Sequence, residues 1–265
     1  MEPSHNIKLF DSHCHIDDRC YENDFAAMLD RAQKAGVAAM LIAGVDAKGA
    51  PKAVRLANRH NPIYAAVGVH PHDARHCTED DLVRLEALSH DTKVVAVGEI
   101  GLDFNRMFSP QKDQEKWFIK LLEMADQWNL PTILHERETE GRLLEMLEAH
   151  NRSYNGVIHC FDGTEKELYR YLDLGLHVGI TGIVTIQKRG ERLRQLALKI
   201  PVDRILIETD APYLTPAPEK NKFRRNEPAF VGRVLHKIAE MRGEEPQILA
   251  TTIWGNTCSL FDVSV

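Results

Sequence analysis

The sequence lacks the features that mark secreted and membrane-spanning proteins. Its five cysteines are odd in number and scattered, with no Cys-x-x-Cys pair, which favours reduced thiols over a disulfide framework. No apolar run approaches the roughly 20 residues that a helix needs to cross a bilayer. Residues 1–8 lack the apolar core of a signal peptide. We therefore expect a cytoplasmic protein that makes no membrane contact.

Positive charge is scarce as well. The chain has 33 Lys and Arg against 39 Asp and Glu, which gives a net charge of −6. This balance argues against the broad basic surface of proteins that wrap nucleic acid. It leaves room for an enzyme that takes a nucleic-acid end into a local, metal-rich pocket. The apolar content of 43% and the charged content of 27% are those of an ordinary globular protein.

The chain alternates regularly between short apolar segments and longer amphipathic ones. The apolar segments are mostly β-branched or aliphatic and lack strict polar alternation, a pattern typical of parallel strands that are buried on both faces. Eight strands are predicted in this way, at residues 7–10, 37–43, 63–69, 94–97, 132–134, 156–158, 177–180 and 204–207.

The segments between these strands carry helix signals. Residues 22–35 end at Gly36, which suits a helix C-terminus before a strand. Residues 78–81, Thr-Glu-Asp-Asp, resemble a capping box. Ser109 and Pro110 offer an N-cap and a first-turn proline for the next helix. We expect eight helices between and after the strands.

Eight strands that alternate with eight helices predict an α/β protein with a (β/α)₈ (TIM) barrel. The rival is a doubly wound open sheet, but no Gly-x-Gly-x-x-Gly follows the first strand. No linker, low-complexity tract or repeat separates a second domain, so residues 1–265 are predicted to form one domain. Residues 245–261 are expected to add a further helix after the barrel closes.

Side chains that can bind a cation stand at the predicted strand ends, where barrel enzymes have their active sites. His13 and His15 point to one face of an extended strand because they are two residues apart. The other strand ends place similar chemistry in the same ring: His70 after the third strand, Glu99 after the fourth, His135 with Arg137 after the fifth, His159 after the sixth and Asp210 after the eighth.

These ligands exceed what one tetrahedral cation needs and suffice for two cations that share a bridge. Glu99 is the predicted bridge, because the two oxygens of a carboxylate can bind different cations. Asp210 is expected to approach the cation of His13 and His15, and to orient or deprotonate the attacking water. Nitrogen and oxygen ligands without thiolates do not select sharply among Mg, Mn and Zn.

Several polar residues keep two interpretations. Arg137 suits a phosphate or carboxylate, or else pairs with Glu138 or Glu140. His70 contacts substrate or lines the rim of the site. The basic run 220–225 is a solvated loop, or it holds a polyanionic substrate.

In combination, seven motifs resemble the TatD family of metal-dependent hydrolases, which is related to the amidohydrolase superfamily. The resemblance extends over residues 9–261. The motifs are Phe-Asp-Ser-His-Cys-His at 10–15, Gly-Val-His-Pro-His at 68–72, Gly-Glu-Ile-Gly-Leu-Asp at 98–103, His-Glu-Arg at 135–137, His-Cys-Phe-Asp-Gly at 159–163, Glu-Thr-Asp-Ala-Pro-Tyr-Leu at 208–214 and Asn-Glu-Pro at 226–228.

The resemblance implies a barrel with two divalent cations that hydrolyses DNA, often from 3′ ends. It implies that the first cation binds His13, His15 and Asp210, that Glu99 bridges, and that the second binds His135 and His159. It also gives Arg137 and His70 phosphate-facing roles. Phe223 departs from the family pattern, which has glycine at this place.

DNA, single-stranded or at its 3′ ends, is therefore the expected substrate, hydrolysed at the phosphodiester by a metal-activated water. No obligate protein partner is expected. Two alternatives remain. The same dinuclear site could hydrolyse amide, ester or aminoacyl-RNA bonds, or the metals could be structural in a binding protein.

Overall fold

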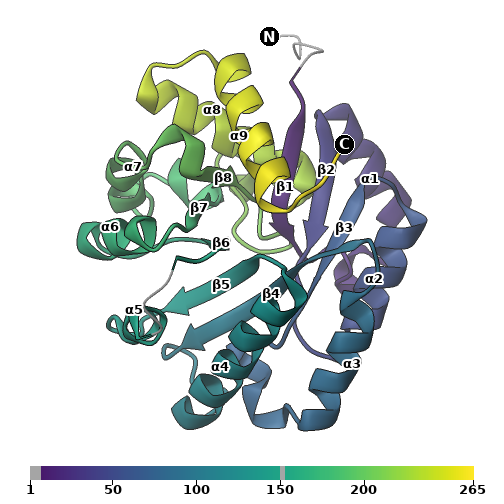
Figure 1. The fold of residues 1–265 in the computed structure, drawn as a ribbon. Coiled ribbons are helices and arrows are strands. Elements are labelled where there is room, and N and C mark those ends of the chain that lie inside the picture. The colour runs from purple at the N-terminus through teal and green to yellow at the C-terminus, as the bar shows by residue number, and fades with distance from the viewer. Residues whose placement is uncertain (1–6, 150–152) are drawn as a thin grey trace. The chain divides into compact units, whose positions relative to one another are not determined.

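The computed structural model describes residues 7–149 and 153–265, and in these it contains all eight predicted strands (Figure 1). They follow one another through the sheet in chain order, β1 to β8, which confirms the predicted (β/α)₈ fold class. Their bounds are β1 Leu9–Cys14, β2 Val37–Ile42, β3 Ile63–Val67, β4 Val94–Asp103, β5 Thr132–Arg137, β6 Gly156–Ile158, β7 His177–Ile180 and β8 Ile205–Ile207.

The chain divides into two compact units. Unit 1 comprises residues 7–42, 178–259 and 263–265. In it β1 pairs with β2, β7 pairs with β8, both in parallel, and β1 also lies against β8. The helices of unit 1 are α1 Phe25–Lys34, α7 Glu191–Ala197, α8 Val231–Arg242 and α9 Pro246–Leu260 (Figure 1). The last of these is the further helix that the sequence predicts.

Unit 2 comprises residues 43–149, 153–177 and 260–262. Here β3, β4, β5 and β6 pair in parallel, and α4 packs along β4. The helices of unit 2 are α2 Ala50–Arg59, α3 Glu79–Ser89, α4 Gln111–Trp128, α5 Arg142–Glu148 and α6 Glu165–Asp173. The single domain expected for residues 1–265 stays a prediction.

Two of the three predicted helix boundaries are confirmed. Gly36 follows α1 with a φ of +87°, the left-handed conformation that glycine adopts at least cost. Thr78 and Asp81 form a capping box at α3, each side chain accepting a hydrogen bond from the backbone of the other. The prediction that Ser109 is the N-cap of α4 is wrong. Pro110 occupies the N-cap position of α4, because the Ser109 hydroxyl donates to the backbone oxygen of His72 and accepts from the amide of Arg75.

Three strands run further than the apolar pattern predicts. β1 continues to Cys14, β4 to Asp103 and β5 to Arg137. The residues from Glu99 to Asp103 are buried although two are acidic and one is glycine. Four polar candidates that the sequence predicts to follow these strands therefore lie within them, namely His13, Glu99, His135 and Arg137, whereas His15 comes directly after β1. Within the described residues, no helix has both the length and the apolarity that crossing a membrane requires.

Candidate metal centre

In unit 1 the strand ends of β1 and β8 bring together His13, His15 and Asp210, which form the first candidate ligand set. The Nε2 atoms of the two imidazoles are 3.4 Å apart. Oδ1 of Asp210 lies 3.7 Å from Nε2 of His13 and 3.3 Å from Nε2 of His15. His13 is fully buried, and the other two side chains are mostly buried. The predicted pairing of the two histidines on one face is thus present.

Asp210 is held by the backbone around it. Its φ of +55° is unusual for a residue with a side chain and is typical of strained functional positions. Its amide donates to the backbone oxygen of His13, and the amide of His15 donates to the backbone oxygen of Ala211. The carboxylate of Asp11 accepts from both the amide and the hydroxyl of the preceding Thr209. These bonds fix the Asp210 carboxylate beside the imidazoles.

In unit 2 the second candidate ligand set consists of Glu99, His135, His159 and His70. Three imidazole nitrogens converge on Oε1 of Glu99: Nδ1 of His135 at 2.5 Å, Nε2 of His159 at 3.3 Å and Nε2 of His70 at 3.5 Å. Glu99 is only 2% exposed. His70 is 8% exposed, so it lies within this buried set; its predicted contact with substrate stays a prediction.

Glycine in β4 allows this convergence. Gly101 lies opposite His135 in the β4–β5 pairing and has a φ of +143°. A Cβ at this position would overlap the backbone oxygen of His135. Close backbone approach at Gly101 therefore places the side chains of Glu99 and His135 within reach of each other.

The electrostatics of the second set differ from one histidine to the next. Burial lowers the pKa of His135, but the negative charge of Glu99 and the Asp103 carboxylate, which accepts from the imidazole, outweigh burial and raise this pKa to about 9. Burial dominates at His70 and lowers its pKa to about 4. Since a histidine binds a cation in its neutral form, a cation at this set competes with the proton of His135.

The carboxylate of Asp103 contacts His135, a member of the second set. Its Oδ2 lies 2.7 Å from Nε2 of His72 and 3.5 Å from Nε2 of His135, and its Oδ1 accepts from the amide of Arg106. Burial raises the pKa of Asp103, but the hydrogen bonds from His135 and His72 outweigh it and hold this pKa well below its usual range. An ionised Asp103 orients the imidazole of His135.

The spacing within each set fits a divalent cation. Two ligands of one tetrahedral cation, each at its usual bond length, lie roughly 3.3–3.4 Å apart. The distances of 3.4 and 3.3 Å from His15 in the first set, and of 3.3 Å from His159 to Glu99 in the second, are of this size. In the second set, ligand atoms of His70, Glu99 and His135 all lie within 4.8 Å of one another. Both sets consist of nitrogen and carboxylate donors, which suits Mg, Mn or Zn.

The basic candidates have separate surroundings. Arg137 ends β5 with an exposed side chain, and among the described residues it forms no ion pair with Glu138 or Glu140. Glu138 instead accepts from the side-chain amide of Asn105. Arg225, part of the basic run 220–225, is bound to Asp24 and Glu227. It is therefore not a free cation of a solvated loop.

Sequence reasoning missed two residues. His72 carries no predicted role, although its spacing of two residues from His70 repeats that of His13 and His15. Asn226 belongs to the Asn-Glu-Pro motif, but the sequence predicts no function for it. Its side-chain amide donates to the backbone oxygens of Thr209 and Tyr213, on either side of Asp210. Apolar periodicity carries no signal for such a bond.

Known proteins resemble this chain over nearly its whole length. Residues 10–262 match a family described as TatD related DNase. A protein of Cronobacter sakazakii named 3′-5′ ssDNA/RNA exonuclease TatD is 42% identical over 257 residues, covering 96% of this chain and 97% of that one. A protein of the same name from Salmonella typhimurium is 38% identical over 258 residues, covering 96% and 99%.

Solved structures agree with the fold. YJJV, a TatD homologue from Escherichia coli K12, superimposes with a TM-score of 0.88 at 32% identity and covers 97% of this chain and 98% of its own. A TatD-family hydrolase from Entamoeba histolytica superimposes with a TM-score of 0.85 at 25% identity, covering 96% and 98%.

Proposed function

The chain belongs to the TatD related DNase family, and from this membership and the two ligand sets we propose that it is a divalent-cation-dependent exonuclease. Its proposed substrate is the 3′ end of single-stranded DNA or RNA, as the names of its full-length relatives suggest. The observation that carries the proposal is the convergence of three imidazole nitrogens on one buried oxygen of Glu99.

We propose one cation at each ligand set, so two in all. Mg, Mn and Zn all suit the donors. That Glu99 bridges the two cations stays a prediction. Divalent cations in such sites lower the pKa of a water and neutralise the charge that develops on phosphoryl oxygens.

The chain's own residues have separate proposed tasks. Asp210 accepts the proton of the attacking water, or orients that water, from a carboxylate fixed by its backbone bonds. Asp103 holds the ring of His135 in place. Arg137, exposed at the end of β5, donates to a phosphate oxygen of the substrate. His70 lies in the second ligand set, and its phosphate-facing role stays a prediction.

Metal removal tests this proposal. Protein stripped of metal is expected to lose exonuclease activity on single-stranded DNA, and added Mg²⁺, Mn²⁺ or Zn²⁺ is expected to restore it. His135→Ala is expected to lose the activity as well, while His236→Ala, which changes an exposed histidine of α8, is expected to keep it. Activity in the presence of chelator, or a fully active His135→Ala, would refute the proposal. Unfolding on metal removal would favour structural metals instead.

A second candidate keeps the ligand sets and changes the scissile bond. The net charge of −6 favours a small substrate over a polyanion, so the same cations would then act on an amide, ester or aminoacyl-RNA bond. Release assays with phosphodiester, aminoacyl ester and cyclic amide substrates on one preparation separate the two. Faster turnover of a carbonyl substrate would favour this second candidate.

We propose the cytoplasm as the compartment. All five cysteines are free thiols in the structure, and Cys14 is fully buried, with its thiol donating to the backbone oxygen of Leu41. Free thiols suit a reducing compartment.

A further inference from the structure

Tyr213 stands out in unit 1 as a large aromatic side chain that is exposed beside a buried ligand set. It lies three residues after Asp210, and its ring meets the ring of His15 edge to face, with centroids 5.9 Å apart at 68°. The tyrosine is 55% exposed, whereas the neighbouring Ala211 is fully buried. An exposed ring in this position offers a flat apolar face to whatever the ligand set binds.

The backbone that carries this ring is fixed at both ends by Asn226. The side-chain amide of Asn226 donates to the backbone oxygen of Thr209 at 2.9 Å and to that of Tyr213 at 2.6 Å. The amide of Tyr213 donates to the backbone oxygen of Asp210, and the amide of Asn226 donates to that of Pro212. These hydrogen bonds constrain the segment 209–213, and such a constraint lowers the entropy cost of stacking on its tyrosine.

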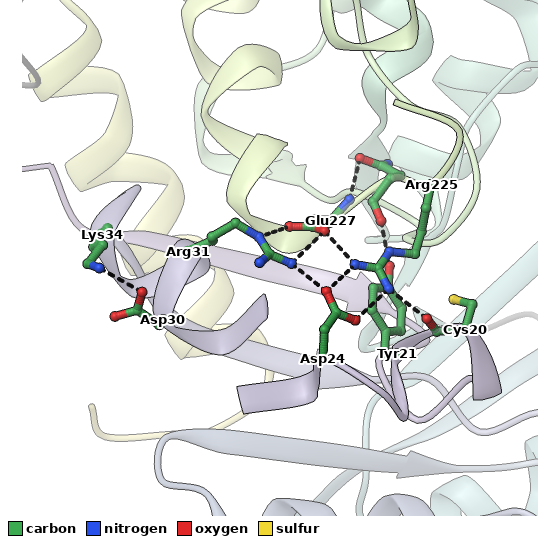
Figure 2. Close-up of polar contacts among 9 residues, drawn as sticks. Cys20, Tyr21, Asp24, Asp30, Arg31, Lys34, Arg225 and Glu227 are labelled. Atoms are coloured by element: carbon green, nitrogen blue, oxygen red, sulfur yellow. Dashed lines mark hydrogen bonds and ion pairs between the residues drawn. The ribbon is translucent and has the colours of Figure 1, made fainter. Parts of the chain in front are cut away.

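Asn226 is itself anchored to α1 and the segment before it. The buried Tyr21 donates its hydroxyl to the backbone oxygen of Asn226 at 2.5 Å. On either side of Asn226, Arg225 and Glu227 join the charge cluster, defined as Asp24, Arg31, Arg225 and Glu227 (Figure 2). The guanidinium of Arg225 also lies over the ring of Tyr21, 4.4 Å from its centroid.

Figure 2 shows how the charge cluster closes on itself. Arg31 and Arg225 both bind Glu227, and both also bind Asp24. Each guanidinium thus has two carboxylate partners, and each carboxylate has two guanidinium partners. A network of this kind constrains its members more than isolated surface pairs do. The cluster holds the residues on both sides of Asn226, which in turn donates to the backbone oxygen of Tyr213.

We propose that Tyr213 is a stacking subsite for the nucleobase of the terminal nucleotide, a role that rests on the proposed exonuclease function. A phosphate that binds a divalent cation held by His13, His15 and Asp210 would bring its own nucleoside next to this ring. Stacking on an aromatic ring accepts every base, which suits an enzyme that removes nucleotides in succession. Tyr213 then positions the substrate without taking part in bond cleavage.

The test compares DNA strands that differ only in the last nucleotide, which carries a base or is abasic. Wild type is expected to cleave the abasic end with a kcat/KM lower by about 5- to 100-fold. Tyr213→Ala is expected to show the same loss on the normal strand and little further loss on the abasic one. Tyr213→Phe keeps the ring and should behave as wild type, and Tyr213→Leu, which keeps apolar bulk, should behave as Tyr213→Ala. Tyr169→Ala, which removes an exposed tyrosine of α6, is the matched control.

A binding measurement separates this proposal from the exonuclease function. The strand carries 2-aminopurine as its terminal base and a phosphorothioate as its last linkage, which resists cleavage. Wild type and Tyr213→Phe are expected to quench the fluorescence, and Tyr213→Ala is not. Quenching by a wild type that cleaves no strand would refute the exonuclease and keep the stacking subsite. Equal losses of Tyr213→Ala on both strand ends, or quenching that survives in Tyr213→Ala, would overturn the subsite.

Discussion

Asp210 combines a left-handed backbone, a mostly buried carboxylate and two imidazole neighbours in one residue. Its amide is hydrogen-bonded to His13, so the position of the carboxylate is set by the strand rather than by its own rotamer alone. Few substitutions could keep both the charge and the backbone conformation, because asparagine and aspartate tolerate positive φ better than other side chains.

We expect Asp210→Asn to keep the fold and lose catalysis. Asparagine retains the left-handed backbone but cannot accept a proton, so kcat should fall by about 10²- to 10⁴-fold. Steady-state kinetics on single-stranded DNA, with circular dichroism to check the fold, measure both effects. Asp203→Asn, an exposed aspartate of the same unit, serves as the control and should leave kcat unchanged. A kcat near wild type for Asp210→Asn would show that the carboxylate is not the proton acceptor.

At this scale the sequence predicts which side chains gather better than it predicts their surroundings. The grouping of His13, His15 and Asp210 could be predicted because they follow apolar runs, whereas their role as ligands stays a prediction. The burial of His70 could not be predicted, because it depends on the side chains that other strands place around this histidine. The same holds for Asp103, whose partner His72 lies 31 positions away.

Among the elements, β4 positions the second ligand set through its glycines. Apolar periodicity ends this strand at residue 97, but sheet pairing with β5 carries it on to Asp103. That continuation depends on a neighbouring strand, which composition does not encode. The capping box of α3, in contrast, lies within four residues and could be predicted from the sequence.

Two glycine substitutions, one expected to destabilise the fold and the other to stabilise it, test the role of β4. Gly101→Ala forces a Cβ into positive φ and against the backbone of His135, so it should destabilise the fold by at least about 2 kcal/mol. Gly255→Ala, in α9 with nothing within 4 Å of the added Cβ, should stabilise by about 0.5–1 kcal/mol. Thermal unfolding of both variants gives the comparison. Equal midpoints would contradict the close approach at Gly101.

At the start of α1, the surroundings of Asp24 predict that the folded protein loses stability in acid. Asp24 occupies the N-cap position, yet its carboxylate binds Arg225 and Arg31, and these hydrogen bonds hold its pKa well below the usual range. Because the folded-state pKa is lower than the unfolded value, Asp24 stabilises the protein above about pH 4, and this stabilisation is lost as the pH falls toward the folded-state pKa.

Urea unfolding of Asp24→Asn and wild type measures this contribution. At pH 7 the variant should unfold at lower urea, and the difference should shrink as the pH falls below about 4. Asp30→Asn breaks a single exposed pair with Lys34 on the same helix and should show a smaller difference at pH 7 (Figure 2). If the difference in urea unfolding between Asp24→Asn and wild type did not change with pH, the lowered folded-state pKa of Asp24 would be contradicted.

For the whole molecule, the fold class could be predicted because each strand and helix has a recognisable apolar pattern in its own short stretch of sequence. The charge cluster could not, because Arg31 and Glu227 are 196 positions apart and polar surface residues have no periodicity that pairs them. The basic run 220–225 illustrates the limit. Its charge predicts either a solvated loop or a site for a polyanion, yet one of its arginines already has two carboxylate partners.

That closed cluster has a consequence for how the molecule responds to salt. Its two guanidinium groups and two carboxylates sum to zero charge, so it displaces no condensed counterions when a strand binds nearby. Because the net charge of −6 elsewhere offers little attraction, we expect side chains to neutralise few phosphates of a bound strand. Log–log plots of kcat/KM against NaCl concentration should then have a slope no steeper than about −2, with about −0.7 for each phosphate.

Arg137→Ala should make this slope shallower by about 0.7, the value of one phosphate contact on a single strand. Initial rates at several salt concentrations and fixed divalent cation measure the change. A slope near −5 for wild type would contradict the small number of phosphate contacts. A slope that Arg137→Ala leaves unaltered would contradict the phosphate contact of Arg137. Within these bounds the enzyme is expected to keep working at ionic strengths that detach nucleases held by basic surfaces, because its hold on the strand releases few ions into solution.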